Sequence, residues 1–119
     1  MTLKKPKEKG RRAELAFAEI LRNSGVDPTA RRMVMSGAIF GLEGDIFGKL
    51  PIHWEIKNQE TWSPLEYYKQ AKEDIPIGSH KKAVVVLTRN REDFYCFLSA
   101  NDFIEILSAA LIGGYCKDY

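Results

Sequence analysis

The sequence predicts an α/β fold with a central sheet flanked by helices, and three patterns predict it. Apolar residues follow a helical period over residues 12–24 and again over 64–75. Apolar and polar residues alternate strictly over 52–57, which is typical of a strand with one buried face. Residues 83–88 form a continuous apolar and β-branched run, which is typical of a strand covered on both faces. We therefore expect this run to be the central strand.

Length and composition restrict the class of protein. The chain has 119 residues, of which 45% are hydrophobic and 29% charged, so it can form one globular domain and is not expected to be disordered. No apolar run approaches the roughly 18–20 residues that a membrane span requires, and no apolar segment follows the first lysines. We therefore expect an intracellular protein without a membrane partner.

Basic residues gather at the N-terminus. Residues 1–12 carry six basic side chains and one acidic side chain, a net charge of +5, whereas the other 107 residues sum to −3. We expect a basic arm over residues 1–11, followed by a single domain over residues 12–119. The natural partner of such an arm is a polyanion. The alternative is a solvated tail without a specific role.

Turn signals and periodicity predict the remaining elements. Ser63 and Pro64 have the pattern that begins a helix with a capping box. Glycines at positions 37, 41, 44 and 48 indicate a loop whose backbone approaches another group closely. We expect a short strand within 32–36, two strands within 45–58 joined near residue 50, a strand over 94–98 and a helix over 102–112.

Ionisable residues are predicted to converge at two neighbouring strands. Glu55 and Lys57 share the polar face of the alternating segment, and a strand pairing about residue 50 places Asp45 opposite Glu55. Glu14 lies at the rim of the buried face of the first helix. Paired carboxylates suit Mg²⁺, and a lysine can orient or deprotonate a metal-bound water. The alternative is a surface salt bridge among Asp45, Glu55 and Lys57.

The order of short motifs along the chain resembles the PD-(D/E)XK nuclease superfamily. The motifs are Lys9-Gly10-x-x-Ala13-Glu14, Ser36-Gly37-Ala38, Gly44-Asp45-Ile46 and Trp54-Glu55-Ile56-Lys57, followed by Gln70. Within the superfamily, the chain is most similar to the small Holliday junction resolvase-like enzymes of archaea and phages. The resemblance covers about residues 9–106. It implies a restriction-endonuclease-like αβββαβ core with a mixed central sheet flanked by helices.

The resemblance also implies roles for single residues. Asp45 and Glu55 correspond to the metal-binding carboxylates, with the Ile56 carbonyl as a further ligand. Lys57 corresponds to the catalytic lysine. Gly44 stands where the name of the superfamily has a proline.

Three more residues correspond to auxiliary positions of the superfamily. Glu14 resembles the helix-borne acid near the metal, Ser36 a loop serine near the scissile strand, and Gln70 an auxiliary residue of the following helix. Glu66 and Lys69 lie within one turn of Gln70 and can take its place.

The function implied by the resemblance is that of a Mg²⁺-dependent endonuclease, with Mn²⁺ as a substitute, that hydrolyses branched DNA such as a four-way junction. It further implies a homodimer in the cytoplasm of a bacterium or a phage-infected cell. Leu111 and Ile112 of the last helix are candidate dimer contacts. The alternatives are a nickase or restriction-like nuclease, a catalytically idle nucleic-acid-binding module on the same fold, and a protein interaction domain.

Basic and loop residues outside the metal-binding motif are candidate DNA contacts. His53 shares the face of Glu55 and can touch a metal or a phosphate, although we expect a polar surface residue there. Trp62, Tyr67 and Tyr68 can stack on nucleotides, but their helical spacing favours a core role. The candidate DNA contacts are Lys5, Lys7, Lys9, Arg11, Arg12, Arg31, Arg32 and Ser36.

Overall fold

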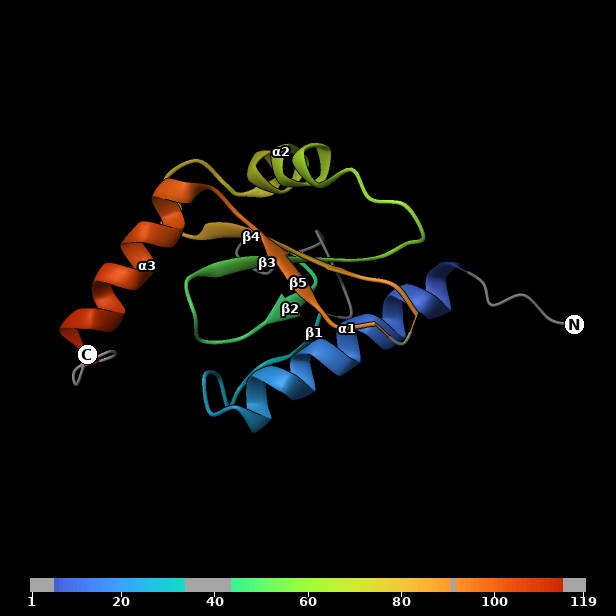
Figure 1. The fold of residues 1–119 in the computed structure, drawn as a ribbon, viewed down its shortest axis with the longest axis horizontal. Coiled ribbons are helices and arrows are strands. Elements are labelled where there is room, and N and C mark those ends of the chain that lie inside the picture. Colours follow the sequence, from blue (N-terminus) through green and yellow to red (C-terminus); the bar gives the residue numbers. More distant parts are fainter. Residues whose placement is uncertain (1–5, 34–43, 91, 115–119) are drawn as a thin grey trace, which may run out of the picture.

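The computed structural model describes residues 6–33, 44–90 and 92–114 and has three layers. A central sheet lies between helix α2 on one face and helix α1 on the other (Figure 1). The elements are α1 Pro6–Asn23, β1 Arg31–Arg32, β2 Ile46–Phe47, β3 Ile52–Asn58, α2 Pro64–Asp74, β4 Lys82–Thr88, β5 Tyr95–Phe97 and α3 Ala100–Ile112. The predicted α/β class is therefore confirmed.

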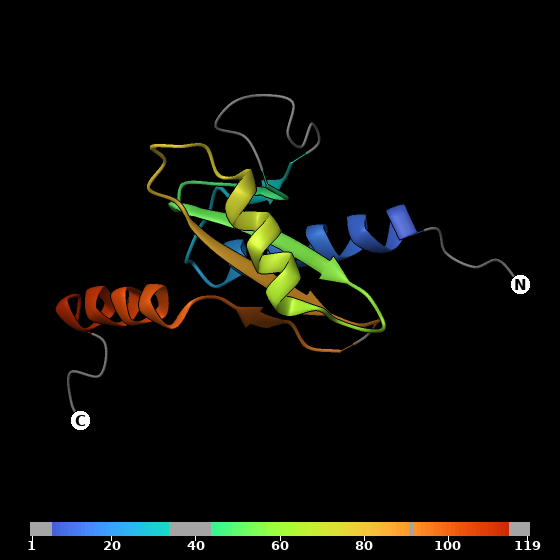
Figure 2. The same cartoon turned by 90° about the horizontal axis from the view of Figure 1, so that it is seen from above.

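The central sheet is mixed, with the strand order β3-β4-β5. Strands β3 and β4 are parallel, with Glu55 opposite Val85, whereas β4 and β5 are antiparallel. Val85 and Val86 of β4 are 0% exposed, which confirms that the continuous apolar run forms the central strand. Helix α2 makes the connection between the parallel strands β3 and β4 and crosses the sheet (Figure 2).

Each face of the sheet has its own apolar core. On the α1 face, the ring of Phe17 packs 5.1 Å from that of Trp54 on β3. On the α2 face, Tyr68 and Ala71 pack against Val85. Strand β3 is therefore covered on both faces, although its alternating sequence predicts only one buried face.

The first helix begins earlier than the sequence predicts. It starts at Pro6 and not at residue 12, and proline is common in the first turn of a helix because that turn does not need its N–H. The second half of the predicted arm, residues 6–11, is thus helical. The predicted capping box is also wrong. Within the described residues, the Ser63 side chain makes no cap hydrogen bond.

The segment between β1 and β3 differs from a simple hairpin. Strand β2 pairs with β1 as an antiparallel ladder. Its link to β3 runs through Asp45, whose N–H donates to the Trp54 carbonyl at 2.9 Å. The short strand predicted within 32–36 is displaced toward the N-terminus and forms β1, and positions 34–36 lie outside the described residues.

Two of the four glycines confirm the predicted close approach of backbone. At Gly48, a Cβ atom would collide with the carboxylate of Asp27. Asp27 is fully buried, and its oxygens accept hydrogen bonds from the Thr29 N–H at 3.0 Å and the Lys49 N–H at 2.9 Å. At Gly44, φ is +98° and a Cβ atom would lie 3.2 Å from the Trp54 carbonyl oxygen.

Helix α3 extends from one end of the sheet in both views (Figures 1 and 2). None of its 13 residues, all of which the structure describes, is buried. Its first turn is held by Lys82, whose Nζ lies 2.6 Å from Glu105 and 3.5 Å from Asp102. Among the described segments, no helix combines the length and the apolar character needed to cross a membrane.

Candidate active site

The predicted metal-binding residues meet at the edge of β3 that faces away from β4. Asp45 is held there by two bonds, since its N–H donates to Trp54 and its Oδ2 accepts the Ile56 N–H at 2.7 Å. In a strand, the N–H and the C=O of one residue point to the same side. The Ile56 carbonyl therefore lies on the edge that carries Asp45.

The charges around Asp45 show that the predicted residues are neighbours. Burial raises the pKa of Asp45 to about 7, and the negative charge of Glu55 adds to this effect. The hydrogen bond from Ile56 and the positive charge of Lys57 lower the pKa, whereas the charge of Glu14 raises it. The fold thus brings the carboxylates of Glu55 and Glu14 and the ammonium group of Lys57 close enough to Asp45 to change its pKa.

Glu14 enters the site from α1, at the rim of the buried face as the sequence predicts. Its Oε1 accepts a hydrogen bond from Arg32 Nε at 2.7 Å. Burial raises the pKa of Glu14, the Arg32 guanidinium opposes that rise, and the charge of Glu55 adds to it. Arg32, which the sequence predicts as a DNA contact, therefore also holds Glu14 in place.

Lys57 lies beside an open hollow. Its Nζ lies 5.2 Å from the centre of the Tyr67 ring, a cation–π contact that holds the ammonium group. A hollow of ≈ 440 Å³ opens along the end of β3, and Lys9 of α1 lines it together with Lys57. Two positive charges therefore face a space that a phosphate group can enter.

Comparison with protein-family models identifies the chain. Residues 5–113 match the family described as "Phage putative PDDEXK endonuclease". The chain belongs to this PDDEXK family. Comparisons with curated proteins and with solved structures returned no match. The matched range includes every element from α1 to α3, so the resemblance to the PD-(D/E)XK superfamily that the short motifs indicate is confirmed.

In this PDDEXK chain, the burial of His53 differs from what the sequence predicts. We expect a surface histidine from the alternating pattern, but the residue is only 1% exposed because α2 covers that face of β3. Its Nε2 lies 3.7 Å from Glu55 Oε1. Ligand atoms of His53, Glu55 and Asp74 all lie within 4.8 Å of one another.

Asp74 is not among the residues that the sequence predicts for the site, whereas Gln70 is. Both residues are on α2, and both are exposed. They are four residues apart and therefore lie on one side of the helix. No local sequence pattern indicates that Asp74, the last residue of α2, lies near His53 and Glu55 of β3.

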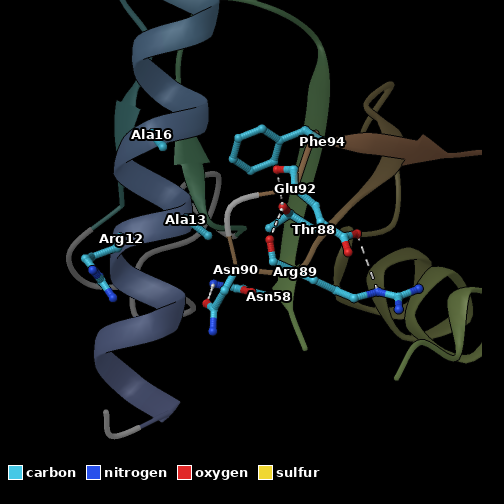
Figure 3. A pocket seen from close by; sticks show the side chains of 9 residues that line it. All are labelled: Arg12, Ala13, Ala16, Asn58, Thr88, Arg89, Asn90, Glu92 and Phe94. Carbon is cyan, nitrogen blue, oxygen red and sulfur yellow. Dashed lines mark hydrogen bonds and ion pairs between the residues drawn. The ribbon is translucent and has the colours of Figure 1, made fainter. Parts of the chain in front are cut away.

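Arg12, a predicted DNA contact, lies near the end of β3 beside residues that were not predicted as contacts. A second hollow, of ≈ 560 Å³, has Arg12 of α1 on one side and Asn58, Asn90 and Arg89 on the other (Figure 3). Asn58 lines both hollows. The Arg89 guanidinium lies 4.4 Å from the centre of the Trp62 ring.

The remaining predicted DNA contacts lie on α1, on β1 or outside the described residues. Arg11 is exposed on α1, and the Arg31 guanidinium lies 4.6 Å from the centre of the Phe47 ring. Lys5 and Ser36 lie outside the described residues, as does the side chain of Lys7.

Proposed function

We propose that this chain is a metal-dependent endonuclease that hydrolyses phosphodiester bonds in DNA, and that branched DNA is its substrate. The observation that carries the proposal is the meeting of Asp45, Glu55 and Lys57 at one strand edge in a member of a PDDEXK family. A domain that only binds DNA gains nothing from two partly buried carboxylates facing a polyanion. This arrangement therefore favours catalysis over passive binding.

The donor set of the site fits a hard divalent cation. Asp45 and Glu55 supply carboxylate oxygens, and the Ile56 carbonyl faces the same edge. The raised pKa of Asp45 reflects burial and the repulsion of Glu55, which a bound cation would relieve. We propose Mg²⁺ as the cofactor, with Mn²⁺ as a substitute. When bound, such an ion lowers the pKa of a coordinated water and neutralises charge on the phosphate.

The side chains around the cation site have separate tasks in this proposal. Lys57 donates hydrogen bonds to the attacking water or to a phosphate oxygen, and its contact with Tyr67 limits where the ammonium group moves. Glu14 orients groups near the cation, and its ion pair with Arg32 fixes its own position. Lys9 and Arg12 line the hollows through which the DNA strand is proposed to pass.

Oligomerisation and substrate shape are linked in the proposal. A single domain with one site cuts one strand at a time, whereas two copies related by a two-fold axis match the approximate two-fold symmetry of a four-way junction. Helix α3 supports a homodimer because it exposes apolar side chains, including Phe103 at 49%, Ile104 at 59% and Leu111 at 56%. The basic residues 1–12 are proposed to add affinity for DNA and not chemistry.

The experiment that tests the nuclease function compares DNA structures and site variants. Purified protein is incubated with Mg²⁺ or Mn²⁺ on labelled four-way junction, flap, single-stranded and linear duplex DNA. We expect the junction to be cut best. Each of Asp45→Ala, Glu55→Ala and Lys57→Ala should reduce the cleavage rate by at least about 100-fold, and Glu14→Ala by less.

Binding measurements provide the control for these variants. DNA affinity should change little in the first three, because phosphate contacts elsewhere supply most of it. Glu19→Ala on the exposed side of α1 should cut like the wild type. Normal cleavage in any of the three site variants contradicts the assignment. Equal cutting of linear duplex and junction favours a nickase or restriction-like nuclease, and binding without cleavage favours an idle module.

A further inference from the structure

A cluster of potential metal ligands lies between the beginning of β3 and the end of α2. His53 and Glu55 are two residues apart on one face of β3, and Asp74 is the last residue of α2. Helix α2 joins two parallel strands, so it runs back along β3 and returns its final turn to the first residues of that strand. One nitrogen or oxygen from each residue lies within 4.8 Å of the others.

The environment of the His53 side chain also indicates a ligand at this cluster. Its side chain is 0% exposed, and among the described residues neither ring nitrogen has a hydrogen-bond partner. The Glu55 oxygen at 3.7 Å from Nε2 is too far for a hydrogen bond. A buried polar group without a partner is unfavourable, and a cation between the imidazole and the carboxylates would satisfy it.

The backbone of Gly44 packs closely against this imidazole. A Cβ atom at Gly44 would lie 3.3 Å from both Nδ1 and Cε1 of His53. The Nδ1 side of the ring is therefore covered by chain, while Nε2 is on the side of the Glu55 carboxylate. The ring presents one nitrogen to the cluster, as histidine does when it binds a metal.

The donors and their spacing indicate the class of cation. A neutral imidazole with two carboxylates suits Zn²⁺ and similar transition metals, whereas Mg²⁺ prefers oxygen ligands alone. Ligands about 2.1 Å from a tetrahedral ion lie about 3.4 Å apart, so the 3.7 Å between His53 and Glu55 needs only a small contraction. The two carboxylates also balance the charge of a divalent ion.

We propose that His53, Glu55 and Asp74 bind a transition-metal dication of the Zn²⁺ class. Three protein ligands leave a fourth position for water or a phosphate oxygen. Glu55 is shared with the proposed nuclease site at Asp45, so the two cations would be neighbours bridged by one carboxylate. Binding at this site does not depend on whether the chain cleaves DNA.

The test is metal titration of the full chain without DNA. Chelator-treated protein is titrated with Zn²⁺ and, separately, with Mg²⁺ by calorimetry. We expect one Zn²⁺ per chain, with an affinity that falls at least tenfold in both His53→Gln and Asp74→Asn. Asp74 is exposed, so its variant should fold even if the histidine variant does not, and circular dichroism checks this.

Two control variants separate this site from its surroundings. Glu73→Gln removes an exposed carboxylate next to Asp74 and should bind Zn²⁺ like the wild type. Asp45→Asn should keep Zn²⁺ binding while weakening that of Mg²⁺. The proposal is wrong if the wild type takes up no Zn²⁺, if Asp74→Asn binds it undiminished, or if only Asp45→Asn loses it. None of these outcomes depends on cleavage.

Discussion

Asp45 carries the largest electrostatic cost in the described part of the candidate active site. Its carboxylate is buried beside Glu55, and the bond from the Ile56 N–H offsets only part of the penalty. The pKa of about 7 is well above the value near 4 expected in the unfolded chain. The folded protein therefore binds a proton more tightly at this residue, so Asp45 stabilises the fold most below pH 4 and its contribution is lost as the pH rises through 7.

Replacing Asp45 by asparagine should change the pH dependence of stability in the absence of divalent cations. Asn keeps an oxygen for the Ile56 N–H but carries no charge. We expect Asp45→Asn to be more stable than the wild type at pH 8, with an advantage about 2 kcal/mol larger than at pH 5. Urea unfolding in the presence of a chelator at both pH values measures this difference.

A surface carboxylate provides the comparison for this prediction. Asp93 is exposed, so Asp93→Asn should follow the pH profile of the wild type. Mg²⁺ should stabilise the wild type more at pH 8 than at pH 5, because protons compete for Asp45. If the free energy of unfolding depended on pH in the same way in the wild type and in Asp45→Asn, the pKa of Asp45 would not be raised as the structure indicates.

The turn before β2 has to pass closely over β3. Gly44 and Gly78 both have positive φ, +98° and +90°. A Cβ atom at Gly44 would contact the Trp54 carbonyl and the His53 ring, whereas a Cβ atom at Gly78 has no atom of another residue within 4 Å. Of these two glycines, only Gly44 combines a left-handed backbone conformation with a close steric contact.

The two glycines make a matched pair of alanine variants. Gly78→Ala should lower the free energy of unfolding by about 1–2 kcal/mol, because alanine adopts a left-handed backbone conformation less readily than glycine. Gly44→Ala should lower the free energy of unfolding by at least about 1 kcal/mol more than Gly78→Ala, because β3 or the His53 ring must move. It should also weaken Zn²⁺ and Mg²⁺ binding, which Gly78→Ala leaves unchanged. Equal losses of unfolding free energy in the two variants would contradict the close packing at Gly44.

Sequence periodicity predicts the elements better than it predicts what covers them. The unbroken apolar run locates β4 as the central strand, and the helical spacings locate α2 and α3 to within two residues. The beginning of α1 is missed because lysine, glutamate and arginine form helices as readily as they form solvated tails. A charge run alone does not distinguish the two.

The proximity of the candidate residues could be predicted where local patterns determine it, and it could not be predicted where the crossover through α2 determines it. Strand alternation places Glu55 and Lys57 on one face, the expected pairing about residue 50 places Asp45 opposite Glu55, and the helical wheel places Glu14 at the rim of the first helix; the structure brings these residues close together. The burial of His53 does not follow, because polar residues on alternate positions indicate solvent unless a functional site accounts for them. The approach of Asp74 depends on the path of α2 across the sheet, which no local pattern encodes.

Helix α3 is amphipathic, and none of the segments that the structure describes covers its apolar side. At about 100° per residue, four of its large apolar residues, Phe103, Ile104, Leu107 and Leu111, fall within a sector about 100° wide, whereas Ile106 and Ile112 lie outside it. All four are between 37% and 59% exposed. Lys82 fixes the first turn through ion pairs with Asp102 and Glu105, so the apolar sector is presented in a defined direction.

Charge placed in this sector should therefore separate a dimer. We expect the wild type to be a dimer by light scattering at micromolar concentration, and the double variant Ile104→Glu with Leu111→Glu to be a monomer. Ile77→Glu is the matched control, because Ile77 is an equally apolar but fully exposed loop residue. Each monomer should retain its own cleavage site, so the double variant should nick junctions where the wild type makes paired cuts.

Mixed subunits distinguish a catalytic dimer from an incidental one. Wild-type chains combined with Lys57→Ala chains should form heterodimers with one working site, and these should cut a single strand of each junction. Paired cuts by such heterodimers would mean that one site serves both strands in turn. A wild-type monomer that cuts linear duplex as well as junction would remove the basis for junction specificity, because one site has no two-fold axis to match with that of the DNA.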